Sequence, residues 1–227
     1  MRIYKSIESI KKDFPNAHII EDDSGFWVYP DGYQKYTISN VRRYLKPRTK
    51  EHIKDILLAG KFPEKLINDA IFNIKETEAV KKIKEVKKNG AVLEGMAGVG
   101  KSTACTWKIA KLLYWWKINN PLYISTVLFD TKAFETFQEY DAYLIDDLLP
   151  NLKDIKVDLI TQIIYYAESK NIPLYITTNS KESFSQFPEP LLSRLRSYCE
   201  YVKIESKKDL RLEKDLILEK PKGGINR

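Results

Sequence analysis

The residues Gly95 to Ser102 constrain this chain more than any other segment. They read GMAGVGKS and match the pattern G-x-x-x-x-G-K-[ST] at every fixed position. The apolar run 91–93 before them suits a buried strand, and Ser102 onward has the spacing of an amphipathic helix. Glycines let the backbone turn tightly and direct its N–H groups at phosphate oxygens, while the helix N-terminus adds partial positive charge. We therefore predict that the chain binds a nucleoside triphosphate.

Within this loop the side chains have separate expected tasks. Lys101 is expected to reach the β- and γ-phosphates, and the Ser102 hydroxyl is expected to ligate Mg²⁺, which prefers oxygen ligands. The nucleotide-contacting residues expected here are Gly95, Met96, Ala97, Gly98, Val99, Gly100, Lys101, Ser102 and Thr103.

The composition narrows the class of protein. Of the 227 residues, 43% are hydrophobic and 30% are charged, which suits a soluble chain with one sizeable core. The N-terminus lacks a signal-peptide core and no apolar run has the roughly 20 residues that span a bilayer, so we expect a cytoplasmic protein. Cys105 and Cys199 have no Cys or His close by in the sequence, which predicts buried thiols and no zinc site.

The net charge of +7 is compatible with contact with an anionic polymer or with a solvated lysine-rich face. Aromatic and basic residues interleave before position 50, as a surface that stacks bases and binds phosphates would require. A packed aromatic sheet beside a solvated helix explains the same pattern. The residues concerned are Tyr33, Lys35, Tyr36, Arg42, Arg43, Tyr44, Lys46 and Arg48.

The first 60 residues differ in pattern from the rest, and we expect a small N-terminal module there that binds a partner or DNA. After a charged, helical stretch at 4–14, residues 17–20 and 26–29 are expected to form a hairpin around an Asp-Asp-Ser-Gly turn. A third strand is expected at 33–38. Two helices follow, the first capped by Thr49 and the second with Pro63 in its first turn.

From residue 76 onward helices and strands alternate, which predicts a parallel sheet between helices. We place the nucleotide-binding domain at 61–205 and a C-terminal tail at 206–227. Helices are expected at 76–88, 102–117 and 157–168, and strands at 91–94, 122–125, 142–145, 174–177 and 201–204.

Two carboxylates follow the apolar strand 142–145. Asp146 is placed to hold Mg²⁺, and Asp147 is placed to polarise the attacking water as a general base. Alternatively, an acidic pair after a buried strand caps a helix.

Two further polar positions follow later strands. Asn179 comes at the tip of strand 174–177, where it would sense the γ-phosphate or orient water, unless it only forms a turn. Arg194 lies in a short basic helix and is a candidate for contacting the γ-phosphate of a neighbouring subunit; a solvated helix surface is the other explanation.

Taken together, GMAGVGKST, LIDDL at 144–148, ITTNS at 176–180 and LLSRLRS at 191–197 resemble the motifs of AAA+ ATPases of the DnaC/IstB group. The resemblance covers about two-thirds of the chain. It implies an α/β fold with a five-stranded parallel sheet in the order 5-1-4-3-2, and ATP hydrolysis at subunit interfaces with Arg194 as the arginine finger. The stretch after the last strand is too short for the helical lid of most AAA+ proteins.

The resemblance also implies a function. It favours an ATP- and Mg²⁺-dependent protein that loads a replicative helicase onto single-stranded DNA and self-associates through its ATP site. Two alternatives remain: a transposition helper of the IstB type that assembles on duplex DNA, and a nucleotide-switched DNA-binding protein with little turnover. An intact set of Lys101, Asp146, Asp147 and Arg194 argues against the last of these.

Overall fold

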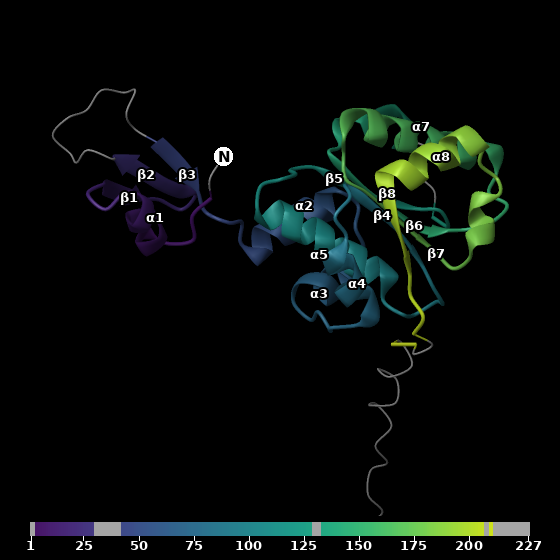
Figure 1. The fold of residues 1–227 in the computed structure, drawn as a ribbon, viewed down its shortest axis with the longest axis horizontal. Coiled ribbons are helices and arrows are strands. Elements are labelled where there is room, and N and C mark those ends of the chain that lie inside the picture. Colours follow the sequence, from purple (N-terminus) through teal and green to yellow (C-terminus); the bar gives the residue numbers. More distant parts are fainter. Residues whose placement is uncertain (1–2, 30–41, 129–132, 207–208, 211–227) are drawn as a thin grey trace, which may run out of the picture.

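The computed structural model describes residues 3–29, 42–128, 133–206 and 209–210. These residues form two sheets, one of three strands and one of five, with helices packed beside them (Figure 1). None of the helices in these ranges is long and apolar enough to span a membrane.

The smaller sheet contains the predicted hairpin. Helix α1 (Ile7–Asp13) precedes strands β1 (His18–Glu21) and β2 (Gly25–Tyr29), which pair antiparallel. The turn is fixed by Asp22, whose carboxylate accepts hydrogen bonds from the backbone N–H groups of Ser24 and Gly25.

The strand that completes this sheet is β3 (Arg42–Leu45), which pairs antiparallel with β2. The strand expected at 33–38 lies outside the described residues. A small core of Tyr4, Ile10, Phe26 and Val28 lies between α1 and the sheet.

The larger sheet has the predicted parallel arrangement. Its strands are β4 (Gly90–Glu94), β5 (Pro121–Ser125), β6 (Ala142–Leu148), β7 (Leu174–Thr178) and β8 (Cys199–Lys203). Their order is β5-β6-β7-β4-β8, and each neighbouring pair is parallel. Counted from the strand before the phosphate-binding loop and read from the β8 edge, this is 5-1-4-3-2. The fold is thus a P-loop α/β fold with the strand order of AAA+ ATPases, as predicted.

Helices cover both faces of this sheet (Figure 1). One face packs against α2 (Lys50–Ala59), α3 (Glu64–Ile71), α4 (Glu78–Glu85) and α5 (Lys101–Tyr114). The other packs against α7 (Asp154–Lys170) and α8 (Glu189–Tyr198). Short helical turns complete the connections: α6 (Ala133–Thr136), η2 (Phe137–Glu139) and η3 (Lys181–Phe184).

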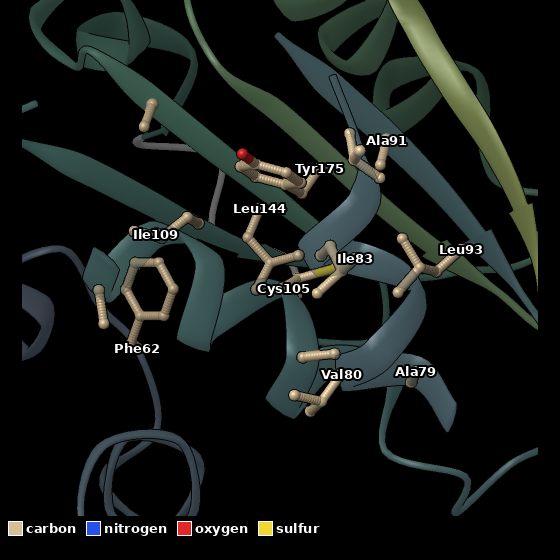
Figure 2. Packing of buried hydrophobic residues seen from close by; sticks show 14 of the residues in the cluster. Phe62, Ala79, Val80, Ile83, Ala91, Leu93, Cys105, Ile109, Leu144 and Tyr175 are labelled. Atoms are coloured by element: carbon tan, nitrogen blue, oxygen red, sulfur yellow. The ribbon is translucent and has the colours of Figure 1, made fainter. Parts of the chain in front are cut away.

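Strand β4 is buried on both faces, as a central strand of a parallel sheet requires. Ala91 and Leu93 point into the core around α4 and α5, while Val92 joins the core under α7 and α8. Figure 2 shows Ala91 and Leu93 with Cys105 of α5 and Tyr175 of β7 in the first of these cores.

Both cysteines are buried free thiols, as predicted. Burial raises the pKa of Cys105 well above its ordinary value and raises that of Cys199 to about 12. Both therefore remain protonated thiols, and neither has the thiolate character that makes a cysteine reactive.

Helix α2 packs with the larger core, through Ile53 and Leu57. Thr49 caps it as predicted, its side chain accepting a hydrogen bond from the His52 N–H at 3.2 Å. Packing therefore groups α2 with the helices around the five-stranded sheet. As a division into domains, the ranges 1–60, 61–205 and 206–227 remain a prediction.

Arg48, in the short link between the two sheets, does not have the exposed position that the predicted DNA-contacting cluster requires. Arg48 is buried, with 6% of its surface exposed, and its guanidinium donates to the carbonyls of Leu113 and Ile118 at 3.0 and 2.8 Å. It also lies 3.8 Å from the centre of the Trp116 ring. Arg48 therefore holds the end of α5 and is not available to bind phosphate.

Lys46 is also engaged, since its ammonium lies 2.7 Å from a Glu21 carboxylate oxygen. Of the remaining members of that cluster, Tyr33, Lys35 and Tyr36 lie outside the described residues.

Candidate nucleotide-binding site

The phosphate-binding loop connects β4 to α5 at the carboxyl edge of the sheet. Gly98 and Gly100 have φ angles of 79° and 89°, in the left-handed region that glycine adopts at little cost. Gly100 is the N-cap of α5, which begins at Lys101, and as a glycine it supplies no side-chain hydrogen bond to the first turn. The loop thus has the backbone form that an anion-binding turn requires.

Lys101 lies at the base of this loop. It is only 5% exposed, and its Nζ donates to the carbonyls of Gly95 and Met96 at 2.7 and 2.8 Å. It also donates to the Asn179 side-chain oxygen at 2.8 Å. Because β7 is the neighbour of β4, the tip of β7 brings Asn179 to the phosphate-binding loop. The structure therefore brings Lys101 and Asn179 together.

Asp146 lies beside the start of α5, at the end of β6. It is 8% exposed, and its Oδ1 accepts a hydrogen bond from the Ser102 hydroxyl at 2.5 Å and from the Thr177 hydroxyl at 2.6 Å. Its Oδ2 accepts one from the Tyr123 hydroxyl at 2.8 Å. The predicted metal ligands Ser102 and Asp146 therefore meet.

This pair fits magnesium and not a metal that needs an all-protein cage. In the described part of the chain no three His, Cys, Asp or Glu side chains gather as a metal site. A magnesium ion in a phosphate-binding loop needs fewer protein ligands, because phosphate oxygens and water fill most of its coordination shell. One hydroxyl and one carboxylate, both hard oxygen donors, meet that requirement.

Asp147 adopts an unusual backbone conformation. Its φ is 53°, and the pairing of β6 with β7 shifts register between Ile145 and Leu148, so that both acidic residues lie on a β-bulge. The Asp147 N–H donates to the Thr177 hydroxyl at 2.9 Å. Left-handed residues other than glycine are uncommon, and they cluster at functional sites.

Arg194 lies on α8, and its contacts are with α7. It is 54% exposed, donates to the Glu168 carboxylate at 2.7 Å and lies 5.4 Å from the Tyr165 ring centre. The hydrogen bond to Glu168 raises the pKa of this already cationic group. The structure does not bring Arg194 to the phosphate-binding loop of its own chain.

Two residues that bind Asp146 were missed by the sequence reasoning. Thr177 and Tyr123 each sit in an apolar strand and look like ordinary β-formers. The signal available in the sequence was their position: both lie within two residues of the carboxyl end of a strand next to β6.

The start of the C-terminal tail also lies against the loop. The Leu210 N–H donates to the Gly98 carbonyl at 3.1 Å, and the Asp209 carboxylate fills the space beside Gly98 that a Cβ would need. The sequence indicated no contact here.

Solved structures align with parts of this chain. The crystal structure of the DnaC helicase loader is 20% identical, with 63% of this chain and 100% of that chain aligned at a TM-score of 0.49. The DnaI structure is 15% identical, over 65% of this chain and 93% of that one, also at 0.49. AMPPCP-bound DnaA from Aquifex aeolicus is 15% identical, over 63% and 52% of the two chains, at 0.45.

No protein-family model matches the chain, and no curated protein does. The assignment of the fold rests on the strand order of the chain's own sheet.

Proposed function

We propose that this chain is a Mg²⁺-dependent ATPase. The observation that carries the proposal is the meeting of four predicted side chains at one edge of the sheet: Lys101 with Asn179, and Ser102 with Asp146. They come from the first turn of α5 and from the carboxyl ends of β6 and β7, yet each contact is 2.8 Å or shorter. A glycine-rich turn without a ligand has no need for a buried ammonium and a buried carboxylate on either side of it.

Each of these residues would have a separate role in binding or hydrolysis. The loop N–H groups and Lys101 would bind the phosphates, since the ammonium exchanges its carbonyl partners for phosphate oxygens. Ser102 and Asp146 would hold Mg²⁺, which neutralises charge that develops on the phosphates. Asp147 would accept the proton of the attacking water, and Asn179 would hold that water or the γ-phosphate in position.

Arg194 would complete the site from a second copy of the chain. Its guanidinium is exposed on α8 and pairs with Glu168 by a bond that water competes for. The Arg194 guanidinium would therefore lose little free energy when it leaves Glu168 to bind a γ-phosphate. Supplied in trans, such an arginine raises the rate of hydrolysis by about 10³-fold or more. This assignment predicts that hydrolysis depends on protein concentration.

A direct test compares Lys101→Ala with Lys111→Ala, which removes an exposed lysine from the same helix. We expect the first variant to bind a fluorescent ATP analogue about 100-fold more weakly, since a charge-assisted hydrogen bond contributes about 3 kcal/mol. The second should bind as the wild type does. Equal affinities for all three proteins would refute the proposed site. A fluorescent GTP analogue in the same assay tests the preference for ATP that the family resemblance implies.

For the cellular role we propose loading of a replicative helicase onto single-stranded DNA. The support is the resemblance of four ordered motifs to the DnaC/IstB group, together with the net charge of +7. Light scattering after size exclusion, with ATP and Mg²⁺ present, tests whether the chain co-elutes with the replicative helicase hexamer of its source. Separate elution, together with assembly on duplex DNA, would instead favour the transposition-helper alternative.

A further inference from the structure

The carboxylate of Asp146 is held at both oxygens. Ser102 and Thr177 donate to Oδ1, whereas Tyr123 donates to Oδ2. The three hydroxyls come from α5, β7 and β5, on three sides of the carboxylate. The oxygen that faces the predicted metal ligand Ser102 is therefore different from the one that faces Tyr123.

Strand register explains why Tyr123 reaches this position. Ser125 of β5 lies opposite Asp146 of β6, and Tyr123 lies two residues earlier on β5. Because side chains alternate along a strand, Tyr123 and Ser125 point to the same face of the sheet. A diagonal neighbour is about 7–8 Å away between Cα atoms, a gap that a tyrosine side chain spans.

The position of Tyr123 is itself restrained by the corner between α2 and α3. The Tyr123 N–H donates to the Gly60 carbonyl at 2.9 Å. The centres of the Tyr123 and Phe62 rings are 5.4 Å apart. Gly60 is pressed against the Pro121 carbonyl, so closely that a Cβ would not fit. Because these backbone and aromatic contacts fix the Tyr123 ring, its hydroxyl is held in one position, beside Asp146.

We propose that Tyr123 is a positioning residue for Asp146: by occupying Oδ2 it keeps Oδ1 turned toward Ser102 and the Mg²⁺ position. This inference rests on the proposed nucleotide site. Outer-shell partners that orient a metal-ligating carboxylate typically change metal affinity by 10–100-fold when removed.

The test compares Tyr123→Phe with Tyr143→Phe. Tyr143 is a buried tyrosine on the adjacent strand β6 whose hydroxyl donates to the Phe137 carbonyl at 2.6 Å, so its variant also loses a buried hydroxyl but none at the site. The affinity for a fluorescent ATP analogue is measured twice for each protein, in excess Mg²⁺ and in excess EDTA. The ratio of the two affinities reports the contribution of the metal, without any need for turnover.

We expect Tyr123→Phe to reduce this ratio about tenfold, with its affinity in EDTA within about twofold of the wild type. Tyr143→Phe should leave the ratio unchanged. An unchanged ratio in Tyr123→Phe would overturn the positioning role, as would an equal loss of affinity with and without Mg²⁺. If the wild type bound no nucleotide, the proposed function would fall as well, so the two failures are distinguishable.

Discussion

Replacing Arg48 by alanine should destabilise the whole chain, although Arg48 is part of a basic, surface-like sequence. Its guanidinium donates to two carbonyls near the C-terminal end of α5, those of Leu113 and Ile118, and the first of these also accepts the Trp116 N–H. It also donates to the Asn119 side chain at 2.6 Å, but Asn119 is exposed and water replaces that bond.

The magnitude follows from these contacts. The Ile118 carbonyl loses its donor, which costs about 1–3 kcal/mol. The Leu113 carbonyl keeps the Trp116 N–H at 2.9 Å and loses one hydrogen bond worth about 1 kcal/mol, so the two losses together cost about 2–4 kcal/mol. Burial of the Arg48 cation is itself unfavourable, as its lowered pKa indicates, and its buried Nε has no hydrogen-bond partner among the described residues. Removing the arginine relieves both of these costs. Allowing about 1 kcal/mol for that relief, and about as much for the lost contact with Trp116, we expect a net loss of about 3 kcal/mol. For a chain of this size the Tm falls by about 6–12 °C.

Differential scanning calorimetry on Arg48→Ala, Arg48→Lys and Arg196→Ala measures this. The lysine variant keeps the positive charge but not the several N–H donors of the planar guanidinium, and we expect its Tm to fall by about half as much as that of the alanine variant. Arg196 forms an exposed ion pair with Glu189, and its removal should change the Tm by no more than about 2 °C. Equal Tm values for Arg48→Ala and Arg196→Ala would refute the reasoning.

The remaining predictions concern the site and the small sheet. Asp147→Asn should abolish steady-state ATP hydrolysis but leave the affinity for the ATP analogue within about twofold of the wild type, because the amide cannot accept the proton of water; unchanged phosphate release would contradict the role given to Asp147. Asp22 has its pKa lowered from 3.8 to about 2, first by its hydrogen bond from Ser24 and next by that from Trp27. Its stabilising effect is therefore complete above about pH 4 and is lost as the pH falls toward 2. In an acid titration followed by tryptophan fluorescence, Asp22→Asn should differ in pH dependence from the wild type only below about pH 4, since asparagine does not titrate; matching curves there would contradict the assignment.

The strand, turn and helix around the phosphate-binding loop could be predicted because they rest on contiguous sequence. The apolar run before Gly95 and the amphipathic pattern after Ser102 together define a strand, a turn and a helix without reference to the rest of the chain. The strand order came from the resemblance of whole motifs, and the pairing confirms it.

What the sequence did not predict depends on pairing across the fold. The bulge that gives Asp147 its left-handed backbone arises from a register shift between β6 and β7, and no glycine marks it. The contact of Tyr123 with Asp146 depends on the register of β5 against β6. Arg48 was misread as a surface cation because its partners are backbone carbonyls far along the chain, which no side-chain pattern reveals.

The central place of β4 in the sheet has a kinetic consequence. Its two neighbours, β7 and β8, both come much later in the chain, so the strand that leads into the phosphate-binding loop is paired only through distant contacts. Contacts of large sequence separation form late, since the loop-closure entropy must first be overcome. A nucleotide at the proposed site thus binds only after the sheet is complete, and it should slow unfolding while leaving the rate of folding nearly unchanged.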